Sequence, residues 1–273
     1  MSAHDDREYA LGTSDAEIVR LGVQHKLWGA AAFAIWERAG IRAGQTVLDI
    51  GCGPGYTSFD LAGVVTTSGR VIAVDESARF IEHLKSRQQR ANDMTIEAVV
   101  GDVQRLELEP ASLDAAYQRW VLCFVKDPEA VVAGVARALK PGGVFAIQDY
   151  MHYEGIVLAP ESEPWRHFIR VVAEAWRGHG GDTEVGQRLP TLLLKHGLTP
   201  VEISPMHRVA RPGSQLWTWP TIFVETYGPK LVDEGKMTRE EYDALVEDWT
   251  RHSNDPAAYF CSPPMVDIIA VKR

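Results

Sequence analysis

The chain has few cysteines, no long apolar run and no excess of basic residues. Only three of its 273 residues are cysteines, namely Cys52, Cys123 and Cys261, and their odd number and wide spacing support neither a disulfide framework nor a zinc finger. No apolar run approaches the roughly 20 residues that cross a bilayer. The first ten residues are polar and acidic, unlike a secretory signal. These absences predict a cytoplasmic protein without a membrane partner.

Charge and composition narrow the function further. Lys plus Arg number 28 against 37 for Asp plus Glu, so the net charge is −9, which repels phosphate backbones at long range. We therefore expect no nucleic-acid partner. Apolar residues make up 45% and charged residues 24%, as in an ordinary globular protein and unlike a disordered chain. No two of the nine histidines lie within five residues of each other, so we expect no local metal-ligand pair and no metal, although ligands assembled from distant segments stay open.

The segment from Thr46 to Tyr150 alternates short β-branched runs with helix-length stretches. This order is typical of βαβ units and of a parallel sheet with helices on both faces. A helix starting near Pro128 ends at a turn over 140–143. The predicted strands are 46–50, 70–75, 95–100, 113–118 and 144–149.

The rest of the chain predicts helices over 164–178 and 184–196, and a long helical stretch over 215–249 that breaks at Gly235. Thr238 and Glu241 have the spacing of a capping box. We expect one domain over 1–273 with an α/β, doubly wound, mostly parallel seven-stranded sheet and an inserted helical lid. Its parts would be N-terminal helices that cover the cofactor (1–39), a cofactor-binding core (40–150), helical substrate and lid segments (151–198 and 205–262) and the last two strands (199–204 and 265–271).

A glycine-rich loop, Asp49-Ile50-Gly51-Cys52-Gly53-Pro54-Gly55, follows the first predicted strand. Glycines there let the backbone approach a ligand closely. Dinucleotide-binding loops space their glycines G-x-G-x-x-G, whereas this loop reads G-x-G-x-G with an acid before it, which favours a ligand with an ammonium group. Asp75 lies 75 − 55 = 20 residues after the last glycine, where an acid binds ribose hydroxyls. The alternative for Asp75 is a helix cap before Ser77.

Together with this loop, the ordered segments VIAVD, Gly101-Asp102, LDAAYQRWVLCFVKDP and LKPGG resemble class I S-adenosylmethionine-dependent methyltransferases over about residues 40–150. The resemblance implies a Rossmann-like fold and S-adenosylmethionine as the cofactor. The chain lacks the Asn/Asp-Pro-Pro-Tyr/Phe motif of enzymes that methylate nucleobase or glutamine amides. Carried over residue by residue, the resemblance implies that Gly51, Gly53 and Gly55 border the methionine part of the cofactor and that Asp49 lies near its amino group. It implies that Asp75 holds the ribose, that Glu76 and Ser77 lie beside the adenosine, and that Asp102 and Val103 contact the adenine. It also implies that Arg119 and Trp120 line the floor below the methyl group.

A second resemblance lies near the N-terminus. Tyr9-Ala-Leu-Gly12, Glu17, Arg20-Leu21 and Gln24 are similar to the opening of a bacterial and fungal group of small-molecule methyltransferases. This resemblance implies that Tyr9 and Gln24 cover the cofactor. Ser14 and Glu17 also have capping-box spacing, and the alternative is an ordinary amphipathic helix packed on the sheet.

Aromatic residues are concentrated after the fifth predicted strand, and two tryptophans stand beside a proline in the stretch 215–220. An insertion of this size predicts a lid over an apolar pocket, although packing in a helical core is the alternative for most of these side chains. A general base is needed only if the methyl acceptor carries a proton at neutral pH. The substrate-binding candidates are Tyr150, Tyr153, Trp217, Trp219 and Phe223, and the candidate bases are His152, Tyr150 and His25.

The function that these patterns favour is transfer of a methyl group from S-adenosylmethionine to a small-molecule acceptor, of the kind found in secondary metabolism. Three alternatives stay open: a non-catalytic S-adenosylmethionine-binding regulator, a methyltransferase of macromolecules, and an NAD-dependent oxidoreductase. No tyrosine has a lysine four residues later, so the catalytic pair of short-chain oxidoreductases is absent. A homodimer also stays open.

Overall fold

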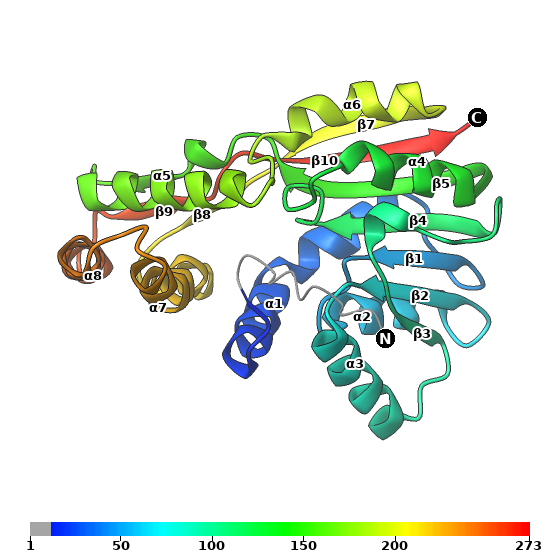
Figure 1. Cartoon of the computed structure of the whole chain (residues 1–273), viewed down its shortest axis with the longest axis horizontal. Coiled ribbons are helices and arrows are strands. Elements are labelled where there is room, and N and C mark those ends of the chain that lie inside the picture. Colours follow the sequence, from blue (N-terminus) through cyan, green and yellow to red (C-terminus); the bar gives the residue numbers. More distant parts are fainter. Residues whose placement is uncertain (1–11) are drawn as a thin grey trace.

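The computed structural model describes residues 12–273 and contains a seven-stranded sheet with the strand order β3-β2-β1-β4-β5-β10-β7 (Figure 1). The five strands from β3 to β5 pair in parallel, and β10 runs antiparallel to both of its neighbours. The predicted doubly wound, mostly parallel sheet is confirmed. The strands are β1 (Thr46–Ile50), β2 (Arg70–Asp75), β3 (Ile96–Val100), β4 (Leu113–Arg119), β5 (Leu139–Tyr150), β7 (Leu198–Met206) and β10 (Met265–Lys272).

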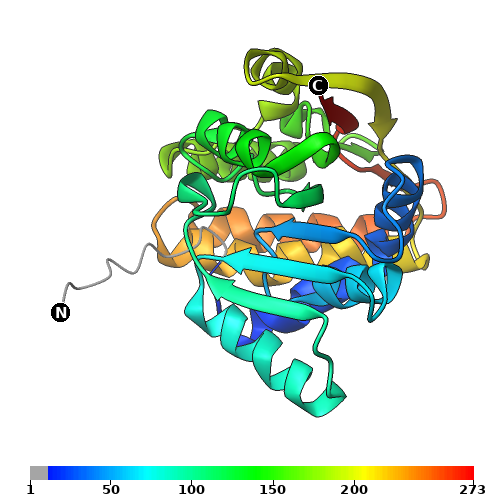
Figure 2. The ribbon, with the colours of Figure 1, turned by 90° about the vertical axis from the view of Figure 1, so that its right-hand side faces the viewer.

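Helices cover both faces of this sheet because successive strand residues point to opposite sides (Figures 1 and 2). Val47 of β1 packs in one apolar cluster, and the next residue, Leu48, packs in another. The first cluster includes α1 (Asp15–Arg38), α2 (Tyr56–Val65) and α3 (Ala78–Ala91), and the second includes α4 (Pro128–Ala138) and α6 (Val185–Lys195).

Strand β5 begins five residues earlier than the sequence predicts. Leu139 already pairs with Leu113, and the register then shifts before Ala115 pairs with Val144. The predicted turn over 140–143 is thus an irregular part of the strand, where Gly142 has a φ of 79°.

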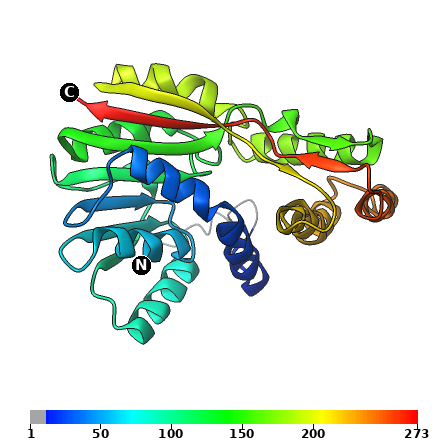
Figure 3. The same cartoon turned by 180° about the vertical axis from the view of Figure 1, so that it is seen from behind.

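A second, three-stranded sheet with the order β6-β9-β8 was not predicted. Its strands are β6 (Val157–Ala159), β8 (Val209–Ala210) and β9 (Tyr259–Cys261), and each has only two or three residues. With α5 (Glu163–Gly178), α7 (Thr218–Asp233) and α8 (Arg239–Ser253) it forms an arm beside the main sheet (Figures 1 and 3). The predicted helix break at Gly235 and the capping box of Thr238 and Glu241 are confirmed.

Candidate functional site

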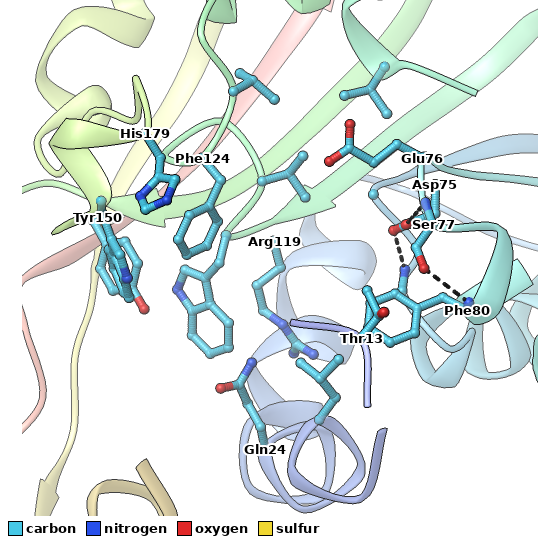
Figure 4. Close-up of a pocket in the computed structure, with 18 of the residues that line it drawn as sticks. Thr13, Gln24, Asp75, Glu76, Ser77, Phe80, Arg119, Phe124, Tyr150 and His179 are labelled. Carbon is cyan, nitrogen blue, oxygen red and sulfur yellow. Dashed lines mark hydrogen bonds between the residues drawn. The ribbon is translucent and has the colours of Figure 1, made fainter. Parts of the chain in front are cut away.

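A cavity of about 1710 Å³ lies where the carboxyl ends of the parallel strands face the arm. Figure 4 shows its two ends, with Asp75, Glu76 and Ser77 on one side and Tyr150 and His179 on the other. The loop end comprises Gly51, Gly53, residues 75–77 and residues 102–105. The aromatic end comprises Trp120, Phe124, Tyr150, Tyr153, Trp165, Trp176, Trp219, Phe223 and Phe260.

The three glycines of the loop have different surroundings, although all have a positive φ. A Cβ on Gly53 would have only Leu21 Cδ1 nearby, at 3.9 Å, so this position borders open space. A Cβ on Gly51 would lie 2.5 Å from Val121, and one on Gly55 would lie 2.5 Å from Leu84. Gly55 also does not line the cavity. Gly53 alone therefore leaves room for a ligand, whereas the other two glycines let the loop pack.

Asp75 joins the glycine loop to the next helix and also faces the cavity. Its Oδ2 accepts a hydrogen bond from the backbone N–H of Gly53 at 2.8 Å, and its Oδ1 accepts one from Ser77 N–H at 2.9 Å. Ser77 is the N-cap of α3. Burial raises the pKa of Asp75 to about 6, although the two N–H donors oppose the shift. The carboxyl group thus supports the loop and cap while it borders the ligand space.

Asp49 lies behind the loop rather than in the cavity. It is buried, and its Oδ2 accepts a hydrogen bond from the Ser58 hydroxyl at 2.6 Å. Burial raises its pKa to about 7, and the Ser58 hydroxyl and the charge of Arg119 oppose the shift. The lining residues do not include Asp49, so its effect on a ligand would pass through the loop.

The other residues expected beside the adenosine come together at the loop end. Glu76, Ser77, Asp102 and Val103 all line it. Asp102 caps a short 3-10 helix, because its Oδ1 accepts a hydrogen bond from Gln104 N–H at 2.9 Å. Carboxyl ends of neighbouring parallel strands meet at one edge of a sheet, which explains this grouping.

Helix α1 reaches from its N-cap, Ser14, into the cavity wall. Glu17 N–H donates to Ser14, but the Glu17 carboxylate forms a buried ion pair with Arg20, so the expected capping box is only half formed. Gln24 Oε1 accepts hydrogen bonds from Arg20 and from Trp219 Nε1, each at 3.0 Å. Gln24 thereby connects α1 to α7. Tyr9 lies outside the described residues.

Arg119 lies between the two ends of the cavity (Figure 4), and the next residue, Trp120, also lines it. The Arg119 guanidinium carbon lies 5.1 Å from the centre of the Trp120 ring, and its Nη2 lies 3.3 Å from His25 Nδ1. Trp120 has a φ of 55°, which is uncommon for a bulky residue and is found at functional sites. Its indole N–H donates to Met265 Sδ at 3.1 Å. The expected floor between the two ends is therefore rigidly held.

Of the three candidate bases, only Tyr150 lines the cavity. His25 is engaged by Arg119 and by Asp60 Oδ2, which is 2.8 Å from its Nε2. The half-exposed His152 pairs with Glu184 at 2.7 Å, away from the cavity. The structure therefore does not bring either histidine to a bound acceptor. His179, which the sequence did not single out, does line the cavity, and its Nδ1 lies 2.7 Å from Ala175 O.

Four of the five substrate-binding candidates, Tyr150, Tyr153, Trp219 and Phe223, line the aromatic end. Trp217 does not. It stacks on Trp249 at 4.7 Å between ring centres and donates its N–H to Ser253, so it packs within the arm. Sequence reasoning missed Phe124, Trp165, Trp176 and Phe260, because apolar spacing on a helix predicts core packing as readily as a pocket wall.

Residues 12–273 contain no group of three or more His, Cys, Asp or Glu residues that could hold a metal ion. None of the helices in this range has the length and apolar character needed to cross a membrane.

Residues 48–147 match the family model described as "Methyltransferase domain". An uncharacterised 37.1 kDa protein of a Streptomyces fradiae transposon is 33% identical over 170 residues, which cover 62% of this chain and 48% of that protein. A 2-phytyl-1,4-naphtoquinone methyltransferase of Synechococcus elongatus is 35% identical over 153 residues, which cover 56% of this chain and 61% of that protein. The chain thus spans about half to three fifths of the length of these curated relatives.

Solved structures agree with the fold. Geranyl diphosphate C-methyltransferase of Streptomyces coelicolor superposes with a TM-score of 0.58 at 16% identity, covering 91% of this chain and 77% of that one. At that identity the likeness establishes the fold alone, which is the Rossmann-like fold of class I methyltransferases.

Proposed function

We propose that this protein transfers a methyl group from S-adenosylmethionine to a small-molecule acceptor. The observation that carries the proposal is a single cavity with a glycine loop and Asp75 at one end and an aromatic enclosure at the other. The methyltransferase-domain match over 48–147 includes the glycine loop and Asp75, and curated relatives are named as quinone methyltransferases, which supports a small acceptor.

The loop end fits the cofactor. A Cβ at Gly53 would meet only Leu21 Cδ1, at 3.9 Å, as expected where a ligand approaches the backbone. The Asp75 carboxylate, held by two backbone N–H groups, would accept hydrogen bonds from ribose hydroxyls. Asp102 and Val103 would hold the adenine, and Arg119 would offer positive charge to the methionine carboxylate.

The aromatic end supports an acceptor that is enclosed rather than docked on an open face. Its side chains come from α5, α7, β5, β9 and the segments that follow β4 and β5, so the arm and the main sheet build it jointly. With the net charge of −9, this enclosure disfavours a nucleic-acid substrate.

Bound S-adenosylmethionine would supply a methyl group activated by a positively charged sulfur. The new bond to the acceptor forms as the carbon–sulfur bond breaks, its electron pair stays on sulfur, and a proton lost by the acceptor passes to water. The chain contributes orientation and exclusion of water, which supply much of the rate of an in-line displacement. Arg119 and Trp120 would hold the boundary at which the two reactants meet.

The test combines binding with turnover. Calorimetry should show one site for S-adenosylhomocysteine and none for NAD, and a panel of metabolites should accept a labelled methyl group. Binding of NAD alone would refute the proposal. Cofactor binding without transfer to any small or macromolecular acceptor would instead support the regulator.

A further inference from the structure

Two indole N–H groups in the cavity wall are buried and make no hydrogen bond within residues 12–273. They belong to Trp165 and Trp176, which are 2% and 3% exposed and both lie on α5. An indole N–H can only donate, so each of them needs an atom with a lone pair opposite it. Buried polar atoms in proteins nearly always have such a partner. Where no protein group faces the N–H, the partner must come from the cavity.

The N–H of Trp176 does face a protein group. Burial raises the pKa of the Tyr227 hydroxyl, and a hydrogen-bonding contact with the Trp176 side chain opposes the rise. The other two indoles of the cavity wall donate to the protein, Trp120 to Met265 Sδ and Trp219 to Gln24 Oε1. Among the cavity-lining indoles, Trp165 alone is then left without a polar partner within residues 12–273.

The Trp165 ring is fixed in apolar surroundings. Its backbone N–H donates to the hydroxyl oxygen of Ser162, the N-cap of α5, at 3.0 Å. The ring stacks on Trp249 at 5.3 Å between centres and meets Phe260 nearly at a right angle at 5.9 Å. Neighbouring rings are weak partners for an N–H compared with an oxygen atom. The indole N–H is therefore a positioned donor, and an oxygen atom of a ligand would gain a hydrogen bond there.

Trp165 lies away from the boundary at which the methyl group would be transferred. The Trp120 ring, next in the chain to Arg119, contacts the Trp219 ring at 5.8 Å between centres. Trp219 contacts Phe260 at 6.1 Å, and Phe260 in turn contacts Trp165 at 5.9 Å. The Trp165 N–H would thus meet a part of the acceptor other than its reacting atom.

We propose that Trp165 determines specificity for the methyl acceptor, and that its indole N–H donates a hydrogen bond to an uncharged oxygen atom of the acceptor away from the reacting atom. This inference rests on the proposed function, because it takes the aromatic end as the acceptor site. The oxygen belongs to a carbonyl, ether or hydroxyl group. A carboxylate would be costly to bury among these rings with one neutral donor, and an ammonium group has no lone pair to offer Trp165.

The test removes the N–H and keeps the ring. In Trp165→β-(3-benzothienyl)alanine, introduced by amber suppression, a sulfur atom takes the place of the indole N–H. The same replacement at Trp36 is the matched control, since Trp36 is 1% exposed, its N–H also lacks a partner within residues 12–273, and it does not line the cavity. Neither replacement breaks a hydrogen bond of the described protein, so both variants should melt at the temperature of the wild type.

Ligands that differ in one oxygen atom give the readout. Three ketones are paired with alkenes of the same shape, in which a CH₂ group replaces the carbonyl oxygen: 2-nonanone with 2-methyl-1-nonene, 2-adamantanone with 2-methyleneadamantane, and 2-acetylnaphthalene with 2-isopropenylnaphthalene. Calorimetry measures the affinity of each. For every pair that binds, the ratio of ketone affinity to alkene affinity should fall about two- to tenfold in the Trp165 variant and stay unchanged in the Trp36 variant.

Nuclear magnetic resonance tests the same contact in the wild type. The protein is labelled with ¹⁵N-tryptophan, and the indole signal of Trp165 is identified by its absence from Trp165→Phe. We expect this signal to move downfield when a ketone is added and to stay in place with the matching alkene, because only the ketone accepts a hydrogen bond. The indole signal of Trp36 should not respond to either.

An unchanged affinity ratio in the Trp165 variant, an equal change in the Trp36 variant, a Trp165 signal that ignores the ketone, or binding of none of the three ketones would overturn the inference. S-adenosylhomocysteine binding is measured on the same preparations. Its absence beside the expected change of ratio contradicts the methyltransferase proposal and leaves the oxygen site in place. Its presence with an unchanged ratio contradicts only the role of Trp165.

Discussion

The raised pKa of Asp75 predicts that cofactor affinity depends on pH. Its carboxylate already accepts hydrogen bonds from Gly53 and Ser77, and two ribose hydroxyls would bring two more donors. Only the ionised carboxylate can accept from all four, because a protonated carboxyl must itself donate. Since the pKa of Asp75 is raised to about 6, ligand binding should release a proton at acidic pH.

The magnitude follows from the ionised fraction of Asp75. With a pKa of about 6 it is roughly 0.9 at pH 7 and roughly 0.09 at pH 5. Affinity for S-adenosylhomocysteine should therefore fall about tenfold between these two pH values. Calorimetry in buffers of different ionisation enthalpy measures both the affinity and the protons released. The amino group of this ligand stays protonated throughout the range, so it does not contribute.

Two variants assign the effect. Asp75→Asn should bind more weakly at pH 7 and show no dependence between pH 5 and 7. Asp114→Asn should behave as the wild type, because Asp114 lies outside the cavity and its bonds to Lys140 and Thr46 keep its pKa low. A flat profile for the wild type would refute the reasoning. A slope that survives in Asp75→Asn would move the titrating group to Asp49.

Three further outcomes are expected. The pKa of Asp49 is about 7 in the folded protein against 3.8 in the unfolded chain, so the ligand-free protein loses stability as the pH rises between these values. In denaturant titrations, Asp49→Asn should raise the free energy of unfolding by up to about 4 kcal/mol at pH 8 and by little at pH 4. Gly53→Ala should lower the affinity for S-adenosylhomocysteine at least about tenfold, in addition to any loss that comes from backbone strain at its φ of 53°. Gly63→Ala, whose Cβ would lie in open space on α2, should leave this affinity unchanged. Equal affinities of the two variants would remove Gly53 from the site. Trp219→Phe loses the hydrogen bond to α1, so it should raise the KM for the acceptor about three- to tenfold and leave cofactor affinity unchanged. Trp217→Phe should change neither quantity. A loss of cofactor affinity in Trp219→Phe would contradict this expectation.

The loop end could be predicted from the sequence because its residues are short-range signals. Each follows a strand whose β-branched run is visible in the sequence, and the carboxyl ends of parallel strands meet at one edge. The cavity lining therefore includes, as expected, Asp75, Glu76, Ser77, Asp102 and Val103. The contacts of individual side chains could not be predicted from the sequence. Asp49, for example, is buried behind the loop.

The aromatic end was only partly predictable, because it is assembled from distant segments. Trp165 and Trp176 belong to α5, whose apolar spacing gives the same pattern for a core and for a cavity wall. The small sheet was missed since strands of two or three residues are too short to show an alternation. His179 follows a helix end beside two glycines, where neither spacing nor a motif marks a site.

The glycine loop shows why a motif locates a site more reliably than it assigns roles. All three glycines have the same sequence signature and a positive φ, so the sequence predicts the same ligand contact for each. The distinction depends on what a Cβ would meet, and the side chains that decide it, Val121 and Leu84, come from elsewhere in the chain. Packing therefore requires glycine at 51 and 55, whereas at 53 it is the proposed ligand that would require it. Substitutions at the first two positions would act on the fold of the loop before they act on binding.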